Sequence, residues 1–152
     1  MSRLLLKHLT QEHAVIGEFL ELLDQEAAAM TGGDFVTLSA LVAQKSQLAV
    51  QIALLDQQRE TEQVALGYAA DRNGADAAAA AGTPALQSAW TDLLGQAAQA
   101  HEKNHRNGAM VHTHLDFTRQ TINFLQARGN PLYGPDGGHQ TGSASGNRLA
   151  LG

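Results

Sequence analysis

The side chains best suited to chemistry lie at residues 101–108, which read His-Glu-Lys-Asn-His-Arg-Asn-Gly. His101, Glu102 and His105 match the His-Glu-x-x-His pattern of zinc hydrolases. On a helix the two imidazoles lie one turn apart and could both bind a metal ion, while the carboxylate could act as base for a bound water. The pattern therefore raises the hypothesis of a metal-dependent hydrolase.

A catalytic zinc needs a third protein ligand, and the sequence does not supply one at a suitable position. No Glu follows Glu102, and the position six residues after His105 is Val111. His112 comes one residue later and, on a continuous helix, lies about 10 Å along the axis from His105. We therefore expect no catalytic residues, no cofactor and no functional metal, with His101 and His105 at most an adventitious pair.

The same segment has a second interpretation, as a contact point between helices. Asn104, Asn107 and Gly108 fall on or beside the apolar face of a long predicted helix. A buried Asn often fixes the register between helices, and a helical Gly costs about 1 kcal/mol relative to Ala. The glycine favours close approach of another backbone at this point. We expect these three residues to form a helix-seam motif.

The spacing of apolar residues in the first half of the chain predicts two antiparallel helices, at about 2–30 and 34–66. Thr31-Gly32-Gly33 ends the first helix, and Asp34 is a suitable N-cap for the second. The two predicted inward stripes are Leu5, Leu9, Glu12, Ile16, Phe19, Leu23, Ala27 and Met30, and then Leu38, Leu41, Lys45, Leu48, Ile52, Leu55 and Arg59. Because the connection is short, the two helices form a hairpin.

The third predicted helix, 84–128, starts at Thr83-Pro84 and contains no further proline before Pro131. Between the hairpin and this helix, 67–83 is expected to be a flexible link, and 130–152, rich in Gly, Ser and Pro, a mobile tail. The predicted fold class is all-α: an antiparallel helical hairpin plus one very long third helix, in an elongated three-helix, coiled-coil-like bundle. We expect 1–129 to be a single helical domain.

Composition narrows the classes of partner. The 152 residues carry ten Lys and Arg against fifteen Asp and Glu, with no basic block, so nucleic acid is not expected as a partner. There is no Cys, and the apolar run Leu4-Leu5-Leu6 is too short for a signal peptide or a membrane span. We expect a cytoplasmic protein without membrane insertion.

Several of these patterns together resemble the FlgN family of flagellar export chaperones. The resemblance covers nearly the whole chain. It is carried by Leu5, Leu9, Glu12 and Ile16, by Asp34, Leu38, Leu41, Lys45 and Leu48, by Arg59, by Asn104-x-x-Asn107-Gly108, and by Leu132-Tyr133-Gly134-Pro135-Asp136-Gly137. The link at 69–82 and the residues after Gly138 match no part of the family pattern.

The resemblance implies a cytoplasmic chaperone of type III export that binds the disordered terminal helical segments of the hook-filament junction proteins FlgK and FlgL. It would prevent premature assembly and deliver these clients to the export gate component FlhA. The implied client-binding residues are Val111, Leu115, Ile122, Leu125 and Phe124, and Tyr133 is the implied docking residue for the gate. A structural coiled-coil adaptor of an unrelated pathway and a zinc-dependent hydrolase remain as alternatives, and the oligomeric state stays open.

Overall fold

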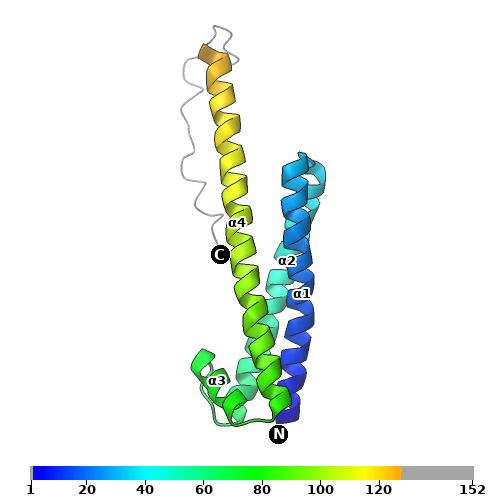
Figure 1. Ribbon diagram of the computed structural model, residues 1–152, viewed down its shortest axis with the longest axis vertical. Coiled ribbons are helices and arrows are strands. Elements are labelled where there is room, and N and C mark those ends of the chain that lie inside the picture. The colour runs from blue at the N-terminus through cyan, green and yellow to red at the C-terminus, as the bar shows by residue number, and fades with distance from the viewer. Residues whose placement is uncertain (1, 128–152) are drawn as a thin grey trace. The chain divides into compact units, whose positions relative to one another are not determined.

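The computed structural model describes residues 2–127, and all four of its helices confirm the predicted all-α class. The helices are α1 (Ser2–Gly32), α2 (Phe35–Ala65), α3 (Arg72–Ala80) and α4 (Pro84–Ala127) (Figure 1). The chain divides into two units, residues 1–103 and residues 104–152, so α4 begins in the first unit and ends in the second. The predicted tail at 130–152 lies outside the described residues, and the extent of the domain, 1–129, stays a prediction.

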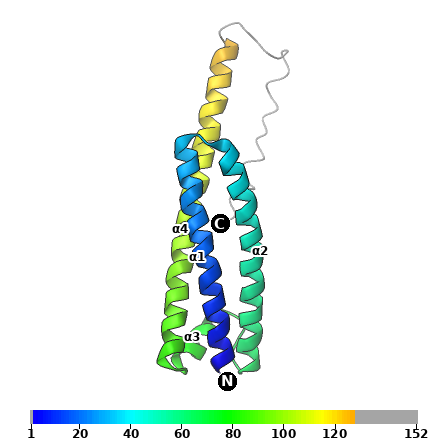
Figure 2. The ribbon, with the colours of Figure 1, turned by 90° about the vertical axis from the view of Figure 1, so that its right-hand side faces the viewer.

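The hairpin of α1 and α2 forms as the sequence predicts, and the two helices run side by side (Figure 2). Gly33 has a φ of 71°, the left-handed conformation that glycine adopts after the last turn of a helix. Asp34 then caps α2, because its side chain accepts a hydrogen bond of 3.2 Å from the backbone N–H of Thr37. These two neighbouring residues therefore reverse the chain.

The expectation of a flexible link over 67–83 is wrong in one respect, because the segment contains helix α3. Asp71 caps α3 by accepting a 2.8 Å hydrogen bond from the backbone N–H of Gly74. Ala75, Ala78 and Ala79 are buried against the hairpin and the start of α4. Alanine has the highest helix propensity, and its small side chain lets α3 lie close to larger apolar residues. The short alanine-rich segment is thus part of the core.

The main core of the first unit joins α1, α3 and the beginning of α4. Its buried members are Leu5, Leu9, Ile16, Ala75, Ala78, Ala79, Leu86, Trp90 and Leu93. The indole Nε1 of Trp90 donates a 2.7 Å hydrogen bond to Oδ1 of Asp76, which ties α4 to α3. Leu5, Leu9 and Ile16 belong to the predicted stripe of α1, which therefore has the correct phase.

A second, smaller core lies toward the α1–α2 turn and contains Leu22, Ala29 and Leu41. Beside it Lys45 of α2 reaches Glu26 of α1, with Nζ and Oε2 3.0 Å apart and the carboxylate side chain 4% exposed. On the other side of α1, Lys103 of α4 pairs with the exposed Asp24 at 2.8 Å. The helices of the first unit are therefore held together by apolar contacts and by ion pairs.

Among the described helices one, α2, is long and apolar enough to cross a membrane, judged by its length and composition alone. Its two basic residues, Lys45 and Arg59, both bind carboxylates of α1. Burial of Leu41 against α1 adds an apolar contact to these ion pairs. Such contacts are typical of a helix packed within a bundle.

Candidate functional site

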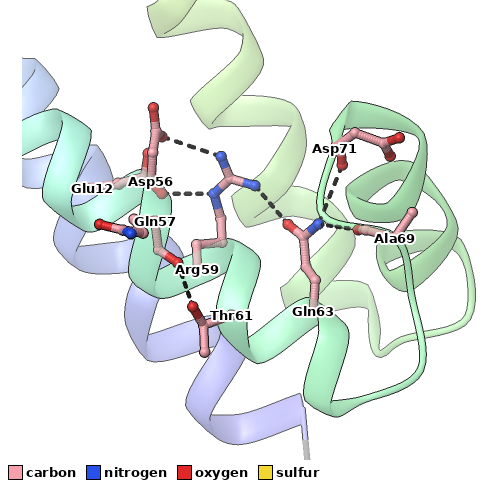
Figure 3. A network of polar contacts seen from close by, with 8 residues as sticks. All are labelled: Glu12, Asp56, Gln57, Arg59, Thr61, Gln63, Ala69 and Asp71. Carbon is pink, nitrogen blue, oxygen red and sulfur yellow. Dashed lines mark hydrogen bonds and ion pairs between the residues drawn. The ribbon is translucent and has the colours of Figure 1, made fainter.

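Arg59 is the centre of a buried polar network that connects three of the helices (Figure 3). Its Nε donates a 2.7 Å hydrogen bond to Oε1 of Glu12 on α1, and its other nitrogens donate to Asp56 at 3.1 Å and to Gln63 at 2.6 Å. The guanidinium also lies over the ring of Trp90 on α4, 5.2 Å from the centroid. A guanidinium suits this position because its planar fork offers several donors at once.

Gln63 extends the network to the segment between α2 and α3. It is 0% exposed, and its Nε2 donates hydrogen bonds to the backbone carbonyls of Ala69 at 2.9 Å and Asp71 at 3.2 Å. The backbone passes so closely here that a Cβ added at Gly74 would overlap the carbonyl group of Ala69. The amide of Gln63 and the missing side chain of Gly74 together fix where α3 begins.

Glu12 is the buried carboxylate of this network, 1% exposed. Burial, followed by a hydrogen bond with Asp56, raises the pKa of Glu12 from about 4.5 to about 8, although Arg59 acts in the opposite direction. The neighbouring cavity, lined by Leu5, Arg59, Gln63 and Trp90 among others, has room for about one water molecule. The network has no space for a substrate, and its geometry is that of a structural clamp.

The residues of the zinc-hydrolase pattern lie on the surface. His101, Glu102 and His105 are all exposed, and His112 is exposed as well. Among the side chains that the structure describes, which leave out His114, no group of three or more His, Asp or Glu is placed to hold a metal ion. The pattern therefore gains no support from the surroundings of these residues.

The described part of the second unit, residues 104–127, carries an exposed apolar stripe. Leu115, Ile122 and Leu125 are 46%, 43% and 52% exposed, and Val111 is half-buried. At about 100° per residue, these four side chains fall within about 80° of arc on one face of α4. Phe124, 58% exposed, lies about half a turn around the helix from Leu115, so it is not part of this stripe.

The predicted helix-seam motif is only partly buried. Asn107 is 1% exposed and Asn104 is half-buried, whereas Gly108 is exposed. A Cβ added at Gly108 would meet no atom within 4 Å. Within the described residues no backbone lies close to Gly108, whereas the backbone of Ala69 lies close to Gly74. The role of the helix-seam motif stays a prediction.

Two further points concern Tyr133 and two polar residues of the first unit. Tyr133, the candidate docking residue, lies outside the described residues. Gln63 and Asp76 were not predicted from the sequence, although Gln63 follows Arg59 by four residues and so lies on the same face of α2. This four-residue spacing could have indicated that Gln63 belongs to the polar network of Arg59.

Comparison with known proteins gives one family. The family model described as "FlgN protein" matches residues 1–141. A flagella synthesis protein FlgN of Yersinia enterocolitica is 29% identical over 146 residues, covering 90% of this chain and 94% of the relative. The protein of the same name from serotype O:8 / biotype 1B of that species is 27% identical, covering 95% of each chain, and the one from Proteus mirabilis is 30% identical, covering 46% and 49%. No solved structure matches the chain.

Proposed function

Because the chain belongs to the FlgN family, we propose that it is a cytoplasmic flagellar export chaperone whose clients are the hook-filament junction proteins FlgK and FlgL. The chaperone binds the disordered terminal helical segment of its client and prevents premature assembly. It then delivers the client to the export gate component FlhA, without inserting into the membrane and without a cofactor.

The observation that carries this proposal is the exposed stripe of Val111, Leu115, Ile122 and Leu125 on α4. An amphipathic helix binds such a surface by laying its own apolar face against residues spaced at three, four and seven. Fully burying a Leu or Ile side chain contributes about 1.5–3 kcal/mol, and about half of each of three stripe side chains is still exposed. Covering these three side chains therefore yields roughly 3 kcal/mol, or about a 100-fold change in affinity.

The proposal also assigns Tyr133 to docking at the gate, on the strength of the resemblance. A Tyr133→Ala variant is expected to bind FlgK and FlgL as tightly as the wild type but to bind isolated cytoplasmic FlhA more weakly. Loss of client binding in this variant would contradict the assignment.

The deciding experiment measures binding of full-length FlgK and FlgL, and of versions without their terminal segments, by isothermal titration calorimetry. We expect binding to full-length clients only. Ile122→Asp places a charge within the stripe and should weaken binding at least about 10-fold. Gln120→Asp is the matched control, because Gln120 is exposed and lies about 160° around the helix from Ile122.

Two outcomes would overturn the proposal. Binding that persists after the terminal segments are removed would instead favour a structural coiled-coil adaptor that recognises a folded partner. Equal weakening by Ile122→Asp and Gln120→Asp would show that the stripe is not the binding surface. In both cases the circular dichroism spectrum of each variant serves as the control for folding.

A further inference from the structure

The outward face of α2 carries an apolar seam that no part of the hairpin covers. Its members are all exposed, with Val36 at 85%, Val50 at 64% and Leu54 at 53%, and they share one face of the helix. We call this set the outer seam: Val36, Ala40, Ala43, Gln47, Val50 and Leu54. It lies on the side of α2 opposite the inward line of Leu41, Lys45 and Arg59.

The spacing of the outer seam is that of a coiled coil. Val36, Ala43 and Val50 recur every seven residues, and Ala40, Gln47 and Leu54 recur every seven residues between them. Alternating steps of four and three keep such a seam facing one partner helix along its length. The pattern therefore indicates a helix as the partner.

The distribution of charge along the chain favours a second copy of this chain as the partner helix. The chain has a net charge of −5, yet none of its fifteen acidic residues lies within residues 35–55. The single charged residue there, Lys45, is directed at Glu26 of α1. Two copies of an acidic protein repel each other over most of their surface, and the outer seam is where this repulsion is smallest. A membrane surface is not favoured, because binding to anionic lipid needs exposed Lys or Arg, and both basic residues of α2 bind carboxylates instead.

The sizes of the side chains suit an antiparallel pairing about a two-fold axis near residue 45. In this register Val36 faces Leu54 of a second copy, Ala40 faces Val50, and Ala43 faces Gln47. Each alanine thus meets a larger side chain, so the two surfaces interdigitate. The symmetry makes the same patch contact itself, as in most homodimers.

We propose that the outer seam of α2 pairs in antiparallel orientation with the outer seam of a second copy of this chain. The seam spans about 27 Å of helix, so the contact lies at the low end of specific interfaces, which bury about 800 Å² on each partner. The dimer is accordingly weak, with a dissociation constant on the order of 10 μM. The outer seam shares no residue with the client-binding stripe of the proposed function.

Sedimentation equilibrium of the full chain without any client tests the proposal, over concentrations from about 1 to 500 μM that bracket the expected dissociation constant. Ala43→Asp places a charge in the seam and should weaken the dimer at least about 10-fold. Ala49→Asp is the matched control, since Ala49 is an exposed alanine of the same helix about 140° from the middle of the seam. It should change the dissociation constant less than about two-fold.

A charge-swap experiment tests the orientation. Gln47→Lys alone should also weaken the dimer, but a mixture of Ala43→Asp and Gln47→Lys should recover it, because residue 43 faces residue 47 of the other copy. Recovery with Ala43→Asp and Ala43→Lys, but not with Gln47→Lys, would show a parallel pairing and overturn the register. Thermal melts of each variant control for folding.

Other results would overturn the proposal itself. A wild-type chain that stays monomeric at 500 μM, or a dimer that Ala43→Asp does not weaken, would show that the seam does not self-associate. If Ala43→Asp instead reduced binding of FlgK or FlgL to a monomeric chain, the seam would be a client surface. If it abolished flotation with neutral phosphatidylcholine vesicles, the seam would bind lipid.

Discussion

Replacing Arg59 by Met tests whether the buried network holds the helices of the first unit together. Methionine retains much of the apolar stem but removes every donor of the guanidinium. The carboxylate of Glu12, 1% exposed, then has no cation at 2.7 Å, and Oε1 of Gln63 loses its donor at 2.6 Å. Leaving a buried polar group without its hydrogen-bond partner typically costs about 1–3 kcal/mol, so with Glu12 and Gln63 both affected we expect Arg59→Met to cost roughly 2–6 kcal/mol.

The pH dependence gives this prediction a second signature. Arg59 favours the ionised form of Glu12, so its removal raises the pKa of Glu12 further. The folded variant then keeps Glu12 protonated to higher pH, whereas the unfolded chain releases this proton above about pH 4.5, so its deficit should be larger at pH 8 than at pH 6. Adding Glu12→Gln to Arg59→Met removes the group that releases a proton on unfolding, so the double variant should be more stable at pH 8 than Arg59→Met alone.

The assay is urea unfolding followed by far-ultraviolet circular dichroism at both pH values, comparing free energies of unfolding. Lys103→Met is the control, because it breaks an ion pair with Asp24, whose side chain is 61% exposed, and should cost about 0–1 kcal/mol. A loss for Arg59→Met no larger than that of Lys103→Met, or a loss that shrinks between pH 6 and pH 8, would refute the view that Arg59 compensates a buried carboxylate.

Three further predictions concern the stability of the chain, measured by the same urea assay. The folded-state pKa of Glu12 is raised to about 8, so the contribution of this group to stability should fall as the pH rises from about 4.5 to 8. A wild type that gained stability relative to Glu12→Gln over this pH range would contradict this prediction. Gly74→Ala should destabilise the chain by more than about 1 kcal/mol, because the new Cβ overlaps the backbone of Ala69. Gly95→Ala is the control and should stabilise the chain by about 0.5–1 kcal/mol, because its new Cβ meets no atom within 4 Å. Equal effects of the two substitutions would refute the close approach at Gly74. Asp34→Ala removes the cap of α2 and should cost about 0.5–2 kcal/mol, with Asp34→Asn near the wild type.

Features that depend on neighbours in the sequence could be predicted. Gly33 and Asp34 mark the turn of the hairpin because a left-handed glycine and an N-cap are local devices. The inward line of α2, with Leu41 and Arg59 buried, follows from a spacing that any helix converts into one face. Exposure of Leu115, Ile122 and Leu125 agrees with their proposed role, which stays a proposal.

Features that depend on residues distant in the sequence were missed. The alanines of α3 gave no apolar periodicity, so nothing local indicated that Ala75, Ala78 and Ala79 would be buried by α1 and α4. A glutamine within a helix normally faces solvent, yet Gln63 is buried because the chain turns back beside it at 69–71. The close backbone approach at Gly74 was likewise missed, since the sequence Asp-Arg-Asn-Gly is equally typical of a turn.

The contact of Gln63 has a consequence for how this family can diverge. Gln63 binds main-chain carbonyls at 69 and 71, which every amino acid possesses, so Ala69 and the exposed Ala70 are free to be exchanged without loss of the contact. The amide at 63 and the glycine at 74 have no such freedom. Among relatives that keep α3, we expect positions 69 and 70 to vary while positions 63 and 74 stay nearly fixed, because the contact is made by the backbone and not by the side chains at 69 and 70.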